Sequence, residues 1–135
     1  VVFKDYAHAP SKVRASVRAV KELYPNREVV ACLELHTFSS LNKNYLPQYK
    51  DSLKGINQAI VFFNPEKVKA KNLEPLTEAD IKNAFGSNTL MVFDDAQKLE
   101  AYLASQNWAN KNLLMMSSGN FAGFNIQTLA EKLLA

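Results

Sequence analysis

Glycine is scarce in this sequence, and the positions of the few glycines exclude two common kinds of nucleotide site. Only four of the 135 residues are glycine, at positions 55, 86, 119 and 123. Neither the G-x-G-x-x-G dinucleotide fingerprint nor the G-x-x-x-x-G-K-[ST] phosphate loop can be built from them. A nucleotide bound by this chain would therefore need another domain to hold its phosphates.

Cysteine is almost absent as well. The single Cys32 has no partner for an internal disulfide and no companion cysteines for a zinc site. It lies within the apolar run 29–33, so we interpret it as a small core residue. No metal site is predicted.

Long apolar runs and a strong charge of one sign are also missing. No run reaches the roughly 18 apolar residues that cross a bilayer, and no signal peptide is recognisable. We therefore expect a cytoplasmic protein with no membrane contact. The 16 basic and 13 acidic residues give a formal charge of only +3, and aromatic and basic residues are not interleaved. This pattern argues against a nucleic-acid partner and supports no more than a mild attraction for phosphates.

The residues that are present suffice for one α/β domain. Apolar residues make up 47% of the chain, and continuous runs rich in β-branched and aromatic residues occupy 1–3, 29–33, 59–63, 90–93 and 113–116. Continuous runs of this length are typical of strands covered on both faces. Segments with helical spacing alternate with them at 13–24, 96–103 and 126–134. We predict a three-layer Rossmann-like α/β fold, with a mostly parallel sheet of about five to six strands and helices on both faces.

Several local features are also predicted. Pro47 interrupts 39–54, which favours two short helices with the second beginning near Pro47. Segment 64–75 is expected to be a surface loop. Thr77 and Asp80 match a capping box, and Gly86 would end the helix that follows. Asp95, with Asp94 before it, is expected to cap the helix that starts near residue 96 and not to act in catalysis.

Three polar clusters follow the first, second and last predicted strands, at 5–10, 34–40 and 117–123. In an open parallel sheet, ligands bind at the carboxyl ends of the strands. Both histidines of the chain, His8 and His36, lie in these clusters. We therefore expect the three loops to meet at one edge of the sheet and to form one site.

The three clusters resemble, in order, signature loops of the third domain of Mur ligases. Residues 5–10 are Asp-Tyr-Ala-His-Ala-Pro, residues 35–39 are Leu-His-Thr-Phe-Ser, and residues 116–123 are Met-Ser-Ser-Gly-Asn-Phe-Ala-Gly. The likeness spans the whole chain and is greatest to the branch of the family that adds alanine or a tripeptide to UDP-N-acetylmuramate. Two departures are Leu35, where proline is usual, and Ala9, where relatives often carry another histidine. The second loop also lacks the arginines common in relatives that select alanine.

The resemblance implies an ATP-dependent ligase of peptidoglycan biosynthesis or recycling, which joins a UDP-N-acetylmuramate carboxylate to an amino acid or peptide. Residues 1–135 would be its C-terminal domain, partnered by N-terminal and central domains of the same parent chain. The chain opens without methionine inside an apolar segment, from which we expect that an upstream part is missing. ATP and Mg²⁺ would be held mainly by the central domain, so the isolated domain is expected to be inactive.

Roles for individual residues follow from the same resemblance. Asp5 would accept hydrogen bonds from the ribose of the nucleotide, and His8 would lie close to that nucleotide. No catalytic residue and no metal ligand is expected in this chain. The residues expected to contact the amine substrate are His36, Thr37, Ser39, Ser117, Ser118, Asn120 and Phe121.

Other interpretations of the same residues stay open at this point. Asp5 could simply cap the helix beginning near Pro10, and both histidines could be ordinary loop residues. The chain could also be a free-standing flavodoxin-like or receiver-like module with a regulatory partner surface. A third domain of a folylpolyglutamate-type ligase is a further alternative.

Overall fold

The computed structural model describes residues 2–87, 89–117 and 129–131. Within them five strands form one sheet in the order β1-β5-β2-β3-β4, and every neighbouring pair is parallel. The strands are β1 (Val2–Asp5), β2 (Glu28–Leu35), β3 (Gln58–Phe63), β4 (Met91–Phe93) and β5 (Lys111–Met116). The predicted parallel α/β architecture is confirmed.

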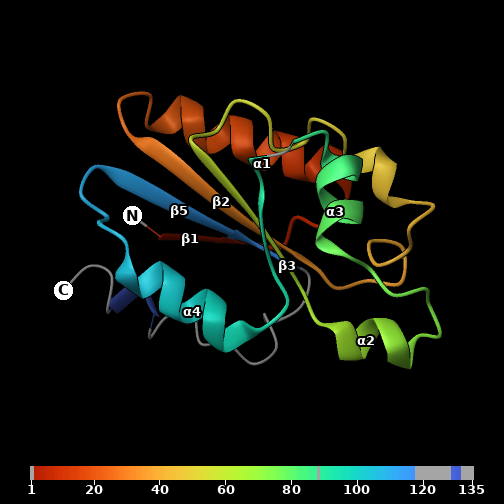
Figure 1. Cartoon of the computed structure of the whole chain (residues 1–135). Coiled ribbons are helices and arrows are strands. Elements are labelled where there is room, and N and C mark those ends of the chain that lie inside the picture. Colours follow the sequence, from red (N-terminus) through yellow and green to blue (C-terminus); the bar gives the residue numbers. More distant parts are fainter. Residues whose placement is uncertain (1, 88, 118–128, 132–135) are drawn as a thin grey trace.

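Helices cover both faces of this sheet, as Figure 1 shows. The helices are α1 (Pro10–Leu23), α2 (Pro65–Ala70), α3 (Glu78–Phe85) and α4 (Ala96–Ser105), with the 3₁₀ helix η1 (Leu46–Tyr49). Helices α1 and α3 lie on one side of the strands and α4 lies on the other. No helix in the described ranges is long and apolar enough to cross a membrane.

Alternating residues of the strands fill two separate cores. On β2, Ala31 and Leu33 face the core shared with α1 and α3, whereas Val30 and Cys32 face the core shared with α4. Because side chains alternate between the faces of a sheet, a strand buried on both faces needs a continuous apolar run. Cys32 is fully buried, and burial raises the pKa of its thiol. The interpretation of Cys32 as a core residue is confirmed.

The predicted helix caps are also confirmed. Thr77 Oγ1 accepts a hydrogen bond from Asp80 N at 3.1 Å, and Asp80 Oδ2 accepts one from Thr77 N at 2.9 Å. Gly86 ends α3 with φ at 70°, a conformation that glycine adopts without steric cost. Asp95 caps α4 by accepting hydrogen bonds from the amides of Gln97 and Lys98.

Two local predictions are wrong, the second of them in part. Segment 64–75 contains helix α2, because Asn64 accepts a hydrogen bond from Glu66 N, Pro65 begins the helix and Val68 is buried beneath it. Of the two short helices predicted in 39–54, the second is present as η1, with Pro47 in its first turn, whereas turns take the place of the first. Lys50, with φ at −49° and ψ at 128°, leaves the helical conformation and ends η1. Of the predicted final helix at 126–134, residues 129–131 are helical and the others lie outside the described residues.

Candidate functional site

The carboxyl ends of β1, β5 and β2 lie side by side at one edge of the sheet, called the carboxyl edge below. In the register of the sheet, Met116 is level with Asp5 on one side and with Leu33 on the other. Ser117 N then donates a hydrogen bond to Asp5 O at 3.0 Å. The start of the third predicted loop therefore touches the first loop directly. The first two loops and Ser117 therefore begin at one edge of the sheet, whereas residues 118–123 of the third loop lie outside the described residues.

A buried contact joins the second and third loops at the same edge. Ser117 Oγ donates a hydrogen bond to Glu34 Oε1 at 2.5 Å, and the two residues are 4% and 1% exposed. Carboxylates are rarely this buried unless they are paired or hydrogen-bonded. The sequence-based reasoning did not select Glu34. Its position as a charged residue inside an otherwise apolar strand was the available signal.

Asp5 is held in place by two protein groups. Oδ1 accepts a hydrogen bond from Ala7 N at 2.9 Å, and Oδ2 accepts one from Ser16 Oγ at 2.8 Å. The N-cap of α1 is Ala9, without a side-chain hydrogen bond. The alternative in which Asp5 caps this helix is therefore wrong. Each carboxylate oxygen keeps a further lone pair, so this fixed side chain can still accept hydrogen bonds from a ligand.

His8 lies on the exposed part of the first loop. Its Nδ1 is 3.1 Å from Tyr6 O, and because a carbonyl only accepts, this ring nitrogen carries the proton. The remaining Nε2 is available to a ligand. The hydroxyl of Tyr49 donates to the carbonyl oxygen of His8 and ties the loop to η1. Burial raises the pKa of Tyr49, so its hydroxyl remains a donor.

His36 contacts a lysine that the sequence-based reasoning missed. Nζ of Lys67, on α2, is 2.8 Å from His36 Nδ1. An ammonium group can only donate, so Nδ1 accepts and the neutral ring carries its proton on Nε2. Partial burial lowers the pKa of His36 most, and the charges of Lys67 and Lys71 lower it further, while Glu34 opposes them. Lys67 was missed because its segment was expected to be a loop.

Of the other predicted site residues in the second loop, Thr37 stabilises a turn and Ser39 is exposed. Thr37 Oγ1 accepts a hydrogen bond from Ser40 N at 3.1 Å, and Ser40 Oγ accepts one from Thr37 N at 2.9 Å. Thr37 therefore stabilises the turn that carries the loop. Ser39 is exposed at the tip of that turn, next to Phe38, which is 57% exposed.

Three of the predicted substrate contacts, Ser118, Asn120 and Phe121, lie outside the described residues. Among the residues that the structure does describe, no group of three or more His, Cys, Asp and Glu side chains could hold a metal ion. The site at the carboxyl edge is thus a set of hydrogen-bonding groups: a fixed carboxylate at Asp5, an imidazole at His8, and a neutral imidazole at His36 beside the Lys67 ammonium.

Comparison with known proteins finds similar sequences and similar folds among ligases. No protein-family model matches the chain. Over 103 residues it is 31% identical to the UDP-N-acetylmuramate–L-alanine ligase of Lactobacillus delbrueckii subsp. bulgaricus, an alignment that covers 76% of this chain and 23% of that enzyme. The chain therefore spans about a quarter of the length of the curated relatives it matches.

Two solved structures share the fold at lower identity. The murein peptide ligase from Psychrobacter arcticus aligns with a TM-score of 0.71 and 21% identity, covering 98% of this chain and 27% of that one. The MurF ligase from Thermotoga maritima, solved in complex with ADP, aligns with a TM-score of 0.57 and 16% identity, covering 98% of this chain and 28% of that one.

Proposed function

We propose that this chain, a Mur ligase C-terminal domain by sequence and by fold, closes over the nucleotide and positions the amine in an ATP-dependent ligase of peptidoglycan biosynthesis or recycling. The proposal rests on one observation: the loops that contain Asp5, His36 and Ser117 begin side by side at one edge of the sheet. An edge of this kind offers one partner domain simultaneous contact with all three loops.

The proposed reaction has two steps. The carboxylate of UDP-N-acetylmuramate attacks the γ-phosphorus of ATP, which gives an acyl phosphate and ADP. The neutral amine of an amino acid or peptide then attacks the acyl carbon, inorganic phosphate leaves, and the ammonium proton is lost as the amide forms. Such a reaction belongs in the cytoplasm, where ATP and UDP-linked precursors are made.

Within this scheme Asp5 and His8 meet the nucleotide. The carboxylate of Asp5 is fixed by Ala7 and Ser16 but keeps acceptor capacity, which suits two ribose hydroxyl donors. His8 offers the ring nitrogen that is not used by its own loop. These contacts would orient the nucleotide while the central domain holds the phosphates.

His36, Ser39 and Ser117 belong to the amine side of the proposed site, together with Ser118, Asn120 and Phe121. Lys67 keeps the His36 ring in the tautomer that carries its proton on Nε2, so the Nε2–H group can donate to the substrate. Thr37 contributes by fixing the turn. The amine substrate is thus expected to lie between the second loop and the third.

Mg²⁺ and the triphosphate are assigned to another part of the parent enzyme. The described residues offer no cluster of metal ligands, and the sequence has no phosphate loop. Mg²⁺ neutralises charge on transferring phosphates, and no residue described here fits that task. We therefore propose that the chain alone neither releases phosphate nor binds ATP tightly.

The test is phosphate release by the intact gene product with ATP, Mg²⁺ and UDP-N-acetylmuramate, supplied in turn with L-alanine and with L-alanyl-γ-D-glutamyl-meso-diaminopimelate. Release that depends on one of these amines supports the proposal, and no release with any amine rejects it. The His36→Ala variant should raise KM for the amine more than KM for ATP. Lys69→Ala, which changes an exposed residue of α2, serves as the matched control.

The two alternative functions have less support. A receiver-like module needs acidic residues clustered at strand ends, but Asp95 is engaged as a helix cap. A folylpolyglutamate-type ligase would share the fold, but the sequence relatives are named for UDP-N-acetylmuramate. A UDP-sugar domain upstream in the gene would separate that enzyme from the one proposed.

A further inference from the structure

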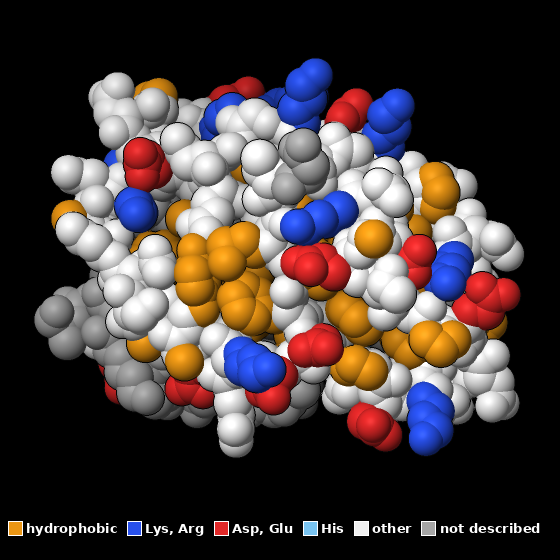
Figure 2. All heavy atoms as spheres, viewed as in Figure 1, with side chains coloured by type: hydrophobic (Ala, Val, Ile, Leu, Met, Phe, Trp, Pro, Cys, Tyr) orange, Lys and Arg blue, Asp and Glu red, His pale blue; other side chains and the backbone are white. Residues whose placement is uncertain are grey.

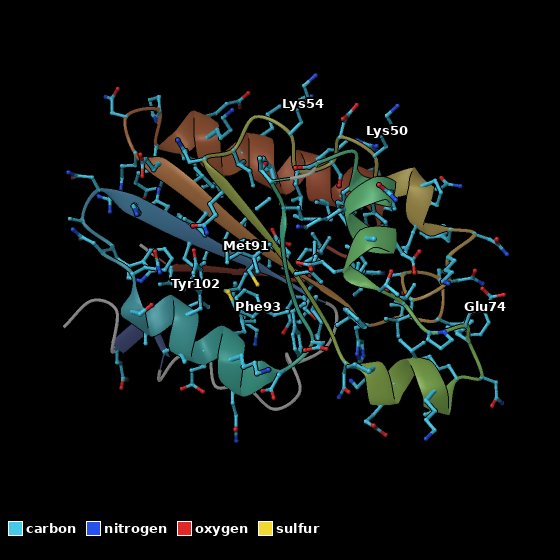
Figure 3. All side chains as sticks on the ribbon, in the orientation of Figure 1. Lys50, Lys54, Glu74, Met91, Phe93 and Tyr102 are labelled. Carbon is cyan, nitrogen blue, oxygen red and sulfur yellow. The ribbon has the colours of Figure 1, made fainter. Side chains whose placement is uncertain are left out.

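A basic groove beside α1 shares none of its lining residues with the three loops of the carboxyl edge. It has a volume of about 520 Å³ and lies between α1 and the segment 51–54. Four cationic side chains line it, Arg14, Arg18, Lys21 and Lys54, and two anionic ones, Glu22 and Asp51, leave a formal charge of +2. In Figure 3, Lys54 projects outward beside α1.

The cations of this basic groove are arranged on a rigid support. Arg14, Arg18 and Lys21 are spaced by four and three residues, which places them on one face of the helix. Arg14 Nη2 donates to the carbonyl oxygens of Gln48 and Lys50 at 3.2 and 3.0 Å. Carbonyl acceptors hold the guanidinium in position without cancelling its charge. Part of the ordering cost of binding an anion is therefore already met by the fold.

The other two cations on α1, Lys21 and Arg18, differ in whether their side chains are held by hydrogen bonds. Lys21 Nζ donates to Gly55 O at 2.5 Å, so this ammonium is fixed over the turn that follows the groove. Arg18 makes no hydrogen bond or ion pair with any residue in the described ranges. Its full planar set of donors is available, and this set matches the oxygens of a phosphate.

We propose that the basic groove on α1 binds the phosphoryl group of a small phosphorylated molecule. A phosphate dianion would neutralise the formal charge of +2, and Arg18 and Lys54 would donate to its oxygens. The volume falls within the range of roughly 300–1,000 Å³ found for small-molecule sites, which leaves room for more than inorganic phosphate. The site is separate from the one proposed at the carboxyl edge and does not depend on the ligase activity.

The experiment is a titration of the intact protein with inorganic phosphate and with glycerol 3-phosphate, followed by NMR amide shifts and by calorimetry. The charge-neutralising double variant Arg18→Gln/Lys54→Gln is compared with Lys69→Gln/Lys98→Gln, which removes the same charge from exposed positions elsewhere. The groove variant should weaken binding by roughly tenfold because two charge-assisted contacts are lost, while the control should leave it nearly unchanged.

Thermal unfolding of the same variants separates binding from folding. The side chains of Arg18 and Lys54 make no hydrogen bond or ion pair with the described residues, so the groove variant should unfold at the temperature of the unchanged protein while binding phosphate more weakly. Tighter binding of glycerol 3-phosphate than of inorganic phosphate supports the proposal as stated. Tighter binding of inorganic phosphate would reject the proposal that the ligand is a phosphorylated molecule. Equal weakening by both double variants, or amide shifts away from residues 14–25 and 51–54, would show general charge attraction and overturn the site itself.

Discussion

The hydrogen bond between Ser117 and Glu34 gives the sharpest test of how the carboxyl edge is held together. The Ser117→Ala change removes a donor from a carboxylate that is 1% exposed, at an Oγ–Oε1 distance of 2.5 Å. Hydrogen bonds to charged groups contribute about 1.5–3 kcal/mol, and water cannot replace this donor at such burial. We therefore expect the free energy of unfolding to fall by about 1.5–3 kcal/mol, which corresponds to a lower Tm by roughly 5–12 °C.

The measurement is urea denaturation followed by circular dichroism, arranged as a double-mutant cycle with Glu34→Gln. Because the amide oxygen accepts a weaker, neutral hydrogen bond, Ser117→Ala should cost about 1 kcal/mol less in the Glu34→Gln background. Ser39→Ala, at an exposed serine of the neighbouring loop, should change stability by less than about 0.5 kcal/mol. A cost of Ser117→Ala that matches this control, or that is the same in both backgrounds, would refute the reasoning.

Three further predictions follow from particular contacts. Lys67→Met should raise the pKa of His36, measured by NMR titration of its ring, because the Lys67 charge lowers it. Since folding lowers this pKa, the free energy of unfolding should rise with pH below the ordinary pKa of about 6.5 and level off above it. The rise of the free energy of unfolding with pH should be smaller in Lys67→Met. Thr77→Ala should destabilise the protein by about 1 kcal/mol in thermal unfolding, since it removes one half of the capping box of α3. Leu99→Ala should cost about 2–5 kcal/mol in urea denaturation, because Leu99 is fully buried between α4 and the sheet.

Much of the fold could be predicted because its determinants are local or periodic. A short continuous apolar run such as that of β2 is typical of a strand buried on both faces, and its alternation with segments of helical spacing then predicts a parallel sheet. The caps at Thr77, Gly86 and Asp95 are set by residues within one turn. Helix α2 was missed because it is short and depends on the burial of a single residue, Val68, against the rest of the fold.

The sequence predicted which loops form the site but not which residues contact them. The carboxyl ends of parallel strands must share an edge, so Asp5, His36 and Ser117 could be grouped from the sequence alone. The contact of His36 with Lys67 depends on helix α2, which carries Lys67 and was not expected. Glu34 was missed since its burial depends on Ser117, which is 83 residues away in the chain.

The central claim is that a nucleotide and an amine bind together at the carboxyl edge. A crystal structure of the intact parent enzyme with Mg²⁺, a non-hydrolysable ATP analogue and the amine that supports phosphate release tests it most directly. We expect the ribose hydroxyls within hydrogen-bond distance of Asp5 and the amine substrate in contact with His36. Ligands bound on another face of this domain, with Asp5 and His36 facing only solvent, would contradict it.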